Sequence, residues 1–310
     1  MPILIKLVKS PKNPIITPRH DVDWEVNGTF NPGATSWNGL THLLYRAVDR
    51  NGISRLGYAQ TSNGVDITLR KCNPVLEPSH PWEEFGCEDP RITKFDGRFY
   101  VTYTAYSRTG PRMALAATSD FVNFEKLGLV GPHRDDKDFV IFPETIGGKI
   151  AILHRLESGV QIAFFDSVNS LTQSEVFWNY YMKRFEEYEV LRSKYPWEER
   201  KVGVGPPPIR TDLGWLMLYH GVSSEKVYRA GAVLLDLDEP QKVVARTSHP
   251  ILEPEADFER TGVVPDVVFP EGAIIRGNEL TVYYGGGDTV CCVARAPLDE
   301  FLDELGKNSA

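Results

Sequence analysis

The feature that most constrains the fold is an apolar run of strand length that recurs along the chain. Five such runs end in polar or aromatic residues, at positions 41–46, 99–104, 150–155, 215–220 and 280–285. Their starts are spaced by roughly 50 to 65 residues, a period typical of propellers and other repeat proteins. Turn sequences such as Asn38-Gly39 and Asp96-Gly97 precede most of them, which is typical of β-hairpins.

A second strand-like run follows each of these, as at positions 113–118 and 231–235. Repeated units built almost wholly of short strands predict an all-β, five-bladed β-propeller, whose strand ends face one central cavity. We find no linker composition, so we predict a single domain over residues 1–310. Residues 297–305 predict a short C-terminal helix, with proline first and leucines and phenylalanine on one face. Residues 182–194 predict a short helix or an irregular insertion.

Charge and cysteine usage exclude several classes of function. The net charge of −8 argues against nucleic acid or an anionic membrane surface as a partner. Residues 1–6 lack the apolar core of a signal peptide, and no apolar run is long enough to span a membrane. The four cysteines form no CxxC pair, so we expect reduced, buried thiols in a cytoplasmic protein without a metal site. The sequence leaves a homo-oligomer open.

The stretch Gly86-Cys87-Glu88-Asp89-Pro90-Arg91 places two acids and an arginine beside a proline, just before a strand-like run. Because proline restricts the residue that precedes it, we predict an extended conformation for Asp89. A carboxylate held in this way beside Arg91 is a candidate catalytic acid. The alternative is a turn that leads into the strand and carries a surface ion pair.

Cations and aromatic residues gather at the predicted strand ends. The cations Arg46, Lys137, Arg155, Lys201 and His220 would form an oxyanion site if they share a cavity, and salt bridges between blades if they do not. The aromatic residues there would either stack on sugar rings or pack between blades; they are Tyr45, Tyr103, Tyr106, Tyr219, Tyr228, Phe269, Tyr283 and Tyr284.

Nine short motifs together resemble glycoside hydrolase family 130, the β-mannoside phosphorylases and related β-mannosidases. In chain order they include Phe30-Asn31-Pro32-Gly33, Glu88-Asp89-Pro90-Arg91, His154-Arg155, Tyr219-His220-Gly221 and Tyr283-Tyr284-Gly285-Gly286-Gly287-Asp288. The resemblance implies a five-bladed propeller and an inverting mechanism. Asp89 would be the general acid, inorganic phosphate would attack the far face of the sugar, and a β-mannoside would give α-mannose 1-phosphate.

The same resemblance assigns the binding residues. The mannose site would comprise Asn31, Arg46, Asp89, Phe269 and Asp288. The phosphate site would comprise Lys137, Arg155, Lys201, His220 and Tyr228, where Lys and His add point charges. Phosphate would be a co-substrate, the β-mannoside the other partner, and no metal or organic cofactor is implied.

Three departures from the family pattern leave alternatives. Lys137-Asp138 stands where some members have Arg-Asn, and Asp138 would repel an anion unless it turns away. Pro32 replaces a serine. Glu271 would be a candidate base if the protein were a hydrolase of β-1,2-mannosides, and a sugar-binding propeller without catalysis is a third hypothesis. Glu88 has no assigned role. We favour phosphorolysis because Arg155, Lys201 and His220 are retained.

Overall fold

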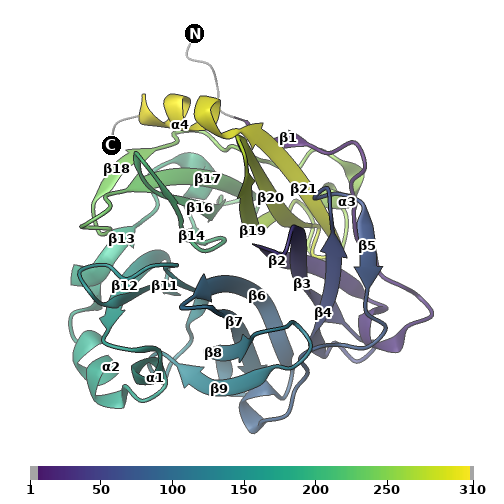
Figure 1. Ribbon diagram of the computed structural model, residues 1–310, viewed down its shortest axis with the longest axis horizontal. Helices are drawn as coiled ribbons and strands as arrows, with labels where there is room; N and C mark the ends of the chain where they lie inside the picture. Colours follow the sequence, from purple (N-terminus) through teal and green to yellow (C-terminus); the bar gives the residue numbers. More distant parts are fainter. Residues whose placement is uncertain (1–5, 308–310) are drawn as a thin grey trace.

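The computed structural model describes residues 6–307, in which antiparallel strands are arranged around a common centre (Figure 1). The strands form four sheets. In the largest sheet, strands β4 and β6 are joined by one parallel pair, Ser54 with Gly86, so this sheet divides into two antiparallel groups. The chain therefore forms five successive strand groups, which agrees with the five predicted repeats. No helix among residues 6–307 is long and apolar enough to cross a membrane.

The first two strand groups occupy the N-terminal part of the chain. The first comprises β2 (Gly28–Trp37), β3 (Leu40–Val48), β4 (Ser54–Thr61) and β5 (Ile67–Arg70). The second comprises β6 (Gly86–Phe95), β7 (Arg98–Ser107), β8 (Gly110–Thr118) and β9 (Glu125–Val130). The predicted turns are confirmed, since Asn38 and Asp96 have φ of 49° and 48° and each is followed by a glycine with φ of 75°. Positive φ at both turn residues suits the twist of a hairpin.

The remaining groups complete the arrangement. The third comprises β10 (Lys137–Ile141), β11 (Ile150–Leu156), β12 (Gly159–Phe165) and β13 (Glu189–Leu191). The fourth comprises β14 (Lys201–Val204), β15 (Ile209–Thr211), β16 (Gly214–Val222), β17 (Tyr228–Leu235) and β18 (Val243–Arg246). The fifth comprises β19 (Val268–Arg276), β20 (Glu279–Gly286), β21 (Val290–Pro297) and the N-terminal strand β1 (Val8–Lys9), which pairs with β21. The five predicted apolar runs lie within β3, β7, β11, β16 and β20.

Strands β2, β6, β14 and β19 lie nearest the centre within their groups (Figure 1). Strand β2 contacts both β6 and β19, and β10 contacts both β6 and β14. Apolar side chains from adjacent groups fill the space between them. One such cluster contains Leu218 and Leu234 of the fourth group together with Val282 of the fifth, all buried. The centre is therefore bordered by five strands that come from distant parts of the sequence.

The helices are short. They are α1 (Val168–Leu171), α2 (Glu175–Tyr181), α3 (Asp257–Arg260), α4 (Leu298–Gly306) and the 3-10 turns η1 (Asp23–Glu25), η2 (Pro81–Glu83), η3 (Phe185–Tyr188) and η4 (Pro196–Glu198). The predicted C-terminal helix is confirmed as α4, with Phe301 and Leu305 buried, although Pro297 lies at its N-cap rather than inside it. In the predicted insertion, η3 and β13 follow helix α2, which ends at Tyr181.

Three cysteines are buried, but Cys72 is exposed because it lies in the loop after β5. The prediction of four buried thiols was therefore wrong at that position. Most of the segment on which we based the absence of a signal peptide, residues 1–5, lies outside the described residues.

A buried glutamate lies in the short helix that precedes the first strand of four of the five groups. A tyrosine hydroxyl of a middle strand donates to each carboxylate: Tyr45 to Glu25 at 3.0 Å, Tyr103 to Glu83 at 2.7 Å, Tyr219 to Glu198 at 2.8 Å and Tyr284 to Glu259 at 2.8 Å. The cations paired with these glutamates include Arg70, Lys126, Arg246 and Lys9. In the third group His154 lies between Asp136 and the hydroxyl of Tyr181 instead. These four tyrosines therefore contact internal carboxylates.

Candidate active site

The first strands of four groups contain a β-bulge where they border the centre. The pairing registers shift between Phe30 and Gly33, between Glu88 and Arg91, between Lys137 and Val140, and between Pro270 and Gly272. Each bulge contains one polar residue, and these are Asn31, Asp89, Asp138 and Glu271. A bulge leaves a residue out of the ladder and redirects its side chain, and bulges are frequent next to active sites. Four polar side chains from distant sequence positions are thereby presented near one another.

The extended conformation that we predicted for Asp89 is wrong, because its φ is 52°. Asn31 and Asp138 have φ of 49° and 58°, so three of the four polar bulge residues have a left-handed backbone conformation. Asn and Asp tolerate this conformation better than other residues with a side chain. Pro90 therefore follows a left-handed residue, and its restriction acts on a bulge rather than on a straight strand. Held strain of this kind is frequent at functional sites.

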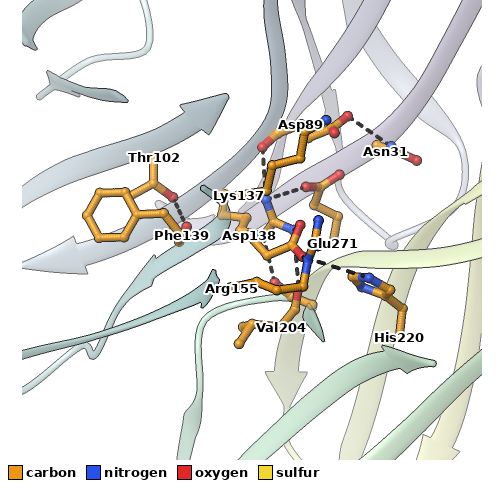
Figure 2. Close-up of polar contacts among 12 residues, drawn as sticks. Asn31, Asp89, Thr102, Lys137, Asp138, Phe139, Arg155, Val204, His220 and Glu271 are labelled. Carbon is orange, nitrogen blue, oxygen red and sulfur yellow. Dashed lines mark hydrogen bonds and ion pairs between the residues drawn. The ribbon is translucent and has the colours of Figure 1, made fainter. Parts of the chain in front are cut away.

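Asp89 lies in a network of donors. Asn31 Nδ2 donates to its Oδ1 at 2.9 Å, and Arg46 Nη1 donates to the same atom at 3.3 Å. Figure 2 shows the side chains of Asn31 and Asp89 pointing toward each other. Burial alone would raise the pKa of Asp89, but the charges of Arg46 and Lys137 and the hydrogen bond from Asn31 outweigh it, so that the pKa is lowered. The carboxyl group is therefore ionised in the ligand-free protein.

Glu88 and Ser54 fix the position of Arg46. Arg46 Nη2 donates to Glu88 Oε1 at 2.7 Å and its Nε donates to Ser54 Oγ at 3.0 Å. The other carboxylate oxygen of Glu88 lies 3.9 Å from Lys137 Nζ. Glu88 thus has a structural assignment that the sequence did not provide. It holds one of the predicted sugar-site cations and lies beside one of the predicted phosphate-site cations.

Two further predicted sugar-site residues border the same centre. Asp288, in the turn between β20 and β21, is close enough to interact electrostatically with Asp89 and Arg46. Burial raises the pKa of Asp288 to about 6, even though Arg46 opposes the change. Phe269, in β19, packs its ring on the imidazole of His220 at 4.5 Å between centroids. The structure thus brings the predicted mannose-site residues into one neighbourhood.

The predicted phosphate-site residues also come together. Lys137 lies opposite Arg155 across the β10–β11 pairing. Lys201 Nζ lies 5.3 Å from the centroid of the Tyr228 ring, and the His220 ring lies 6.0 Å from that of Tyr228. Burial and the nearby Arg155 charge lower the pKa of Lys201 to about 8.

His220 differs from our expectation that it adds a point charge. Its side chain is buried, and burial lowers its pKa to about 3, although the nearby Asp138 opposes the change. The imidazole is therefore neutral at neutral pH. A neutral imidazole still offers one N–H donor to an anion. Its contribution would be a hydrogen bond rather than a charge.

Asp138 does not present a free negative charge to the centre. Arg91 Nη2 donates to its Oδ1 at 3.2 Å, and Arg155 Nε donates to its Oδ2. Burial would raise the pKa of Asp138, but the charges of Arg155 and Arg91 outweigh burial and hold the pKa well below its usual range. The repulsion that the sequence suggested is therefore offset by two guanidinium groups.

Glu271 is fully buried beneath the site. Its Oε1 lies 2.8 Å from Arg91 Nη1, yet neither carboxylate oxygen meets a donor in hydrogen-bond geometry. We treat the pair as a close charge contact. Burial raises the pKa of Glu271 well above its usual range. A base that activates water must reach water, and the position of Glu271 against Arg91 does not favour that role.

An open hollow of 330 Å³ adjoins the cations. It is lined by Pro111, Arg134, Asp135, Asp136, Lys137, Arg155 and Glu157. Among residues 6–307 no group of three or more His, Cys, Asp and Glu side chains is arranged to hold a metal ion. The site combines the carboxyl group of Asp89, polar side chains that can form hydrogen bonds with a sugar, and a cluster of cations.

Sequence reasoning missed the contacts of Glu88, Arg91 and Asp138. One signal was present, because Asn31 and Asp89 each lie seven residues before the hairpin residue Asn38 or Asp96. Equal spacing from equivalent turns indicates equivalent positions in two repeats. That comparison would have placed Asn31 and Asp89 on adjacent first strands.

Comparison with known proteins gives a consistent result. A family model described as β-1,4-mannooligosaccharide phosphorylase matches residues 6–307. A 1,2-β-oligomannan phosphorylase of Thermoanaerobacter sp. (strain X514) is 39% identical over 94% of this chain and 97% of the relative. The solved structure of β-1,2-mannobiose phosphorylase from Listeria innocua with β-1,2-mannobiose is 30% identical, covers 97% of this chain and 99% of its own, and has a TM-score of 0.84.

A third match concerns hydrolysis. Its description states that the GH130 family of mannoside phosphorylases contains glycoside hydrolases, and that these hydrolases target β-1,2 mannosidic linkages in Candida mannan. It is 26% identical, covers 96% of this chain and 95% of its own, and has a TM-score of 0.83. Proteins with this fold thus include both phosphorylases and hydrolases.

Proposed function

Because the chain belongs to glycoside hydrolase family 130, whose model spans residues 6–307, we propose that it catalyses the inverting phosphorolysis of β-mannosides with Asp89 as the general acid. The observation that carries this proposal is that one site holds both an enclosed carboxyl group and several cations. Asp89 is near enough to Lys137 for the lysine charge to lower its pKa, and Lys137 is paired with Arg155 in the adjacent strand. The same cluster of cations can thus act on the pKa of the acid and bind the phosphate anion.

Asp89, once protonated, transfers its proton to the glycosidic oxygen, directly or through a sugar hydroxyl, as the bond from the anomeric carbon to that oxygen breaks. An oxygen of hydrogen phosphate forms the new bond to the anomeric carbon from the opposite face, giving α-mannose 1-phosphate. The phosphate proton that is then released restores the proton on Asp89. One acid and one nucleophile on the far face are sufficient for inversion.

Asp89 must gain a proton before it acts, since its pKa is lowered in the ligand-free protein. A bound mannoside would exclude water, which favours the neutral form of a carboxyl group. It would also compete for the donors Asn31 and Arg46, which stabilise the ionised form. Both effects raise the pKa of Asp89 in the complex. Substrate binding thereby prepares the acid.

Phosphate would bind to Lys137, Arg155 and Lys201, with His220 and Tyr228 donating hydrogen bonds. Arginine and lysine contacts to phosphate are charge-assisted and stronger than neutral hydrogen bonds. Asn31, Arg46, Phe269 and Asp288 would hold the mannose unit. We assign no metal or organic cofactor, and the cytoplasmic location remains a prediction.

We further propose that the five strand groups are the five blades of a single-domain β-propeller. The order of the groups around the centre and the pairing of β1 with β21 support this arrangement. Pairing of the first strand with the last group would close the ring and leave no exposed edge there. The catalytic centre would then lie at the axis.

The test is incubation with β-1,2- and β-1,4-linked mannobiose, with and without phosphate, followed by detection of mannose 1-phosphate and free mannose. We expect sugar phosphate only when phosphate is present. Asp89→Asn should lower the rate by roughly 10²- to 10⁴-fold, the typical contribution of a general acid. Asp96→Asn, at an exposed turn of the same hairpin, should keep the wild-type rate. Equal turnover to free mannose without phosphate would instead identify a hydrolase.

A further inference from the structure

We infer that Arg91 and Asp138 are positioning residues, which form a buried bridge between the acid-bearing bulge and the phosphate-site cations. This inference rests on the proposed phosphorolysis, because it assigns a role in holding phosphate opposite the acid. Neither residue belongs to the predicted sugar or phosphate sites.

Arg91 is 1% exposed. Its guanidinium donates hydrogen bonds to acceptors in the second, third and fourth strand groups. Its Nη1 donates to the main-chain carbonyl of Asp89 at 3.2 Å, which ties it to the acid-bearing bulge. Its Nε and Nη2 donate to the carbonyls of Gly205 and Val204 at 2.8 and 3.1 Å, directly after and within β14. The planar guanidinium has several donors in fixed directions, which a lysine cannot supply.

Asp138 continues the bridge to the cations. It receives Arg91 on one carboxylate oxygen and Arg155 on the other, with His220 Nε2 3.8 Å from the second oxygen. Strand β14 packs closely against Asp138, because a Cβ at Gly203 would lie 2.3 Å from Asp138 Oδ2. Asp138 is therefore enclosed between Arg91, Arg155 and a glycine that leaves it room (Figure 2 shows Asp138 beside Arg155).

The bridge has a chemical consequence. In an inverting displacement the attacking phosphate and the acid must be held on opposite faces of one sugar, and small errors in placement reduce the rate strongly. Arg155 is held by Asp138, Asp138 by Arg91, and Arg91 by the main chain of Asp89. The separation between phosphate and acid is thus fixed by buried contacts rather than by the substrates.

Asp138→Asn distinguishes this positioning role from a purely electrostatic one, because the two roles predict opposite changes in KM for phosphate. If Asp138 acted only through its charge, removing that negative charge next to cations would strengthen phosphate binding. If Asp138 positions Arg155, releasing Arg155 would weaken phosphate binding. We expect KM for phosphate to rise about tenfold to a hundredfold, the worth of a hydrogen bond to a charged group, while KM for the mannoside stays unchanged.

The control is Asp212→Asn, which removes the same charge from an exposed turn that does not line the hollow and should leave KM for phosphate close to the wild-type value. The second variant is Arg155→Lys, which keeps the charge but lacks the Nε donor, and which should raise KM for phosphate to a similar degree. Combining Asp138→Asn with Arg155→Lys should raise KM for phosphate by less than the product of the two single effects, because the two changes share the contact between Asp138 and Arg155.

The outcomes are distinguishable. A fall or no change in KM for phosphate in Asp138→Asn, or additive effects in the double variant, would overturn the inference and leave the proposed function intact. If Asp138→Asn does not fold, Arg155→Lys alone decides, since an unchanged KM for phosphate in that variant contradicts positioning by Asp138. A wild-type protein without phosphate-dependent turnover would remove the proposed function and this inference with it.

Discussion

Phosphate binding should weaken as the pH rises above 8, because the side chain of Lys201 loses its charge there. Burial and the neighbouring Arg155 lower the pKa of Lys201 to about 8. The protonated amine is the form that binds an anion, so affinity is greatest below this pKa and falls above it. Replacing Lys201 by arginine, which stays charged throughout this range, should remove the effect.

The magnitude follows from the pKa. The charged fraction of Lys201 is about one half at pH 8, about one tenth at pH 9 and about one hundredth at pH 10. KM for phosphate should therefore rise about fivefold from pH 8 to pH 9 and approach tenfold for the next unit. The total is limited by the ~1.5–3 kcal/mol that a hydrogen bond to a charged group contributes. The pKa of Tyr228 is raised by burial, so its hydroxyl is not the source of this change.

The assay is the initial rate of phosphorolysis at saturating mannoside, with phosphate varied at each pH between about 7 and 10. The KM for the mannoside, measured in parallel, controls for titration of the acid. A Lys201→Arg variant whose phosphate KM rises with pH as steeply as that of the wild type would refute the reasoning. So would a flat profile in the wild type.

Three further predictions concern stability and reactivity. Tyr219→Phe removes the hydroxyl that donates to a buried carboxylate at 2.8 Å and should cost about 1.5–3 kcal/mol in the free energy of unfolding, whereas Tyr106→Phe, at an exposed position, should leave urea denaturation unchanged; equal midpoints would contradict the assignment. Gly33→Ala should lower both stability and activity, because the new Cβ would lie 2.2 Å from the carbonyl oxygen of Pro90 beside the acid; wild-type thermal unfolding and turnover would show that the two bulges are not in contact. A thiol reagent should label only Cys72 in the native protein, since the other three cysteines are buried, and mass spectrometry that finds a second fast-reacting thiol would disagree.

The repeat and its strands could be predicted because they depend on local sequence. Alternating apolar residues between turn signals specify a strand and its hairpin wherever they occur, and runs such as 99–104 and 215–220 therefore lie in β7 and β16. The C-terminal helix follows for the same reason. Local preference was enough where one face had to be buried and the turn chemistry was unambiguous.

The site could be predicted only as a set of residues. Asp89 was expected to be extended on the basis of its proline neighbour, but pairing of β6 with β7 places it in a left-handed bulge. The neutral state of His220 and the pairing of Asp138 depend on burial by strands from other groups. None of these properties is encoded within a short window, since each arises from contacts between distant segments.

The pairing of β1 with β21 sets the order in which the protein can be completed during synthesis. Val8 lies opposite Arg295, so β1 must wait for the residues between them to be synthesised before its partner strand leaves the ribosome. At ~5–20 residues per second the wait is on the order of 15–60 s. Throughout that interval β1 has no partner strand. The fifth group is therefore completed only after β21 has been synthesised, and a chain stalled before β21 would leave β1 unpaired.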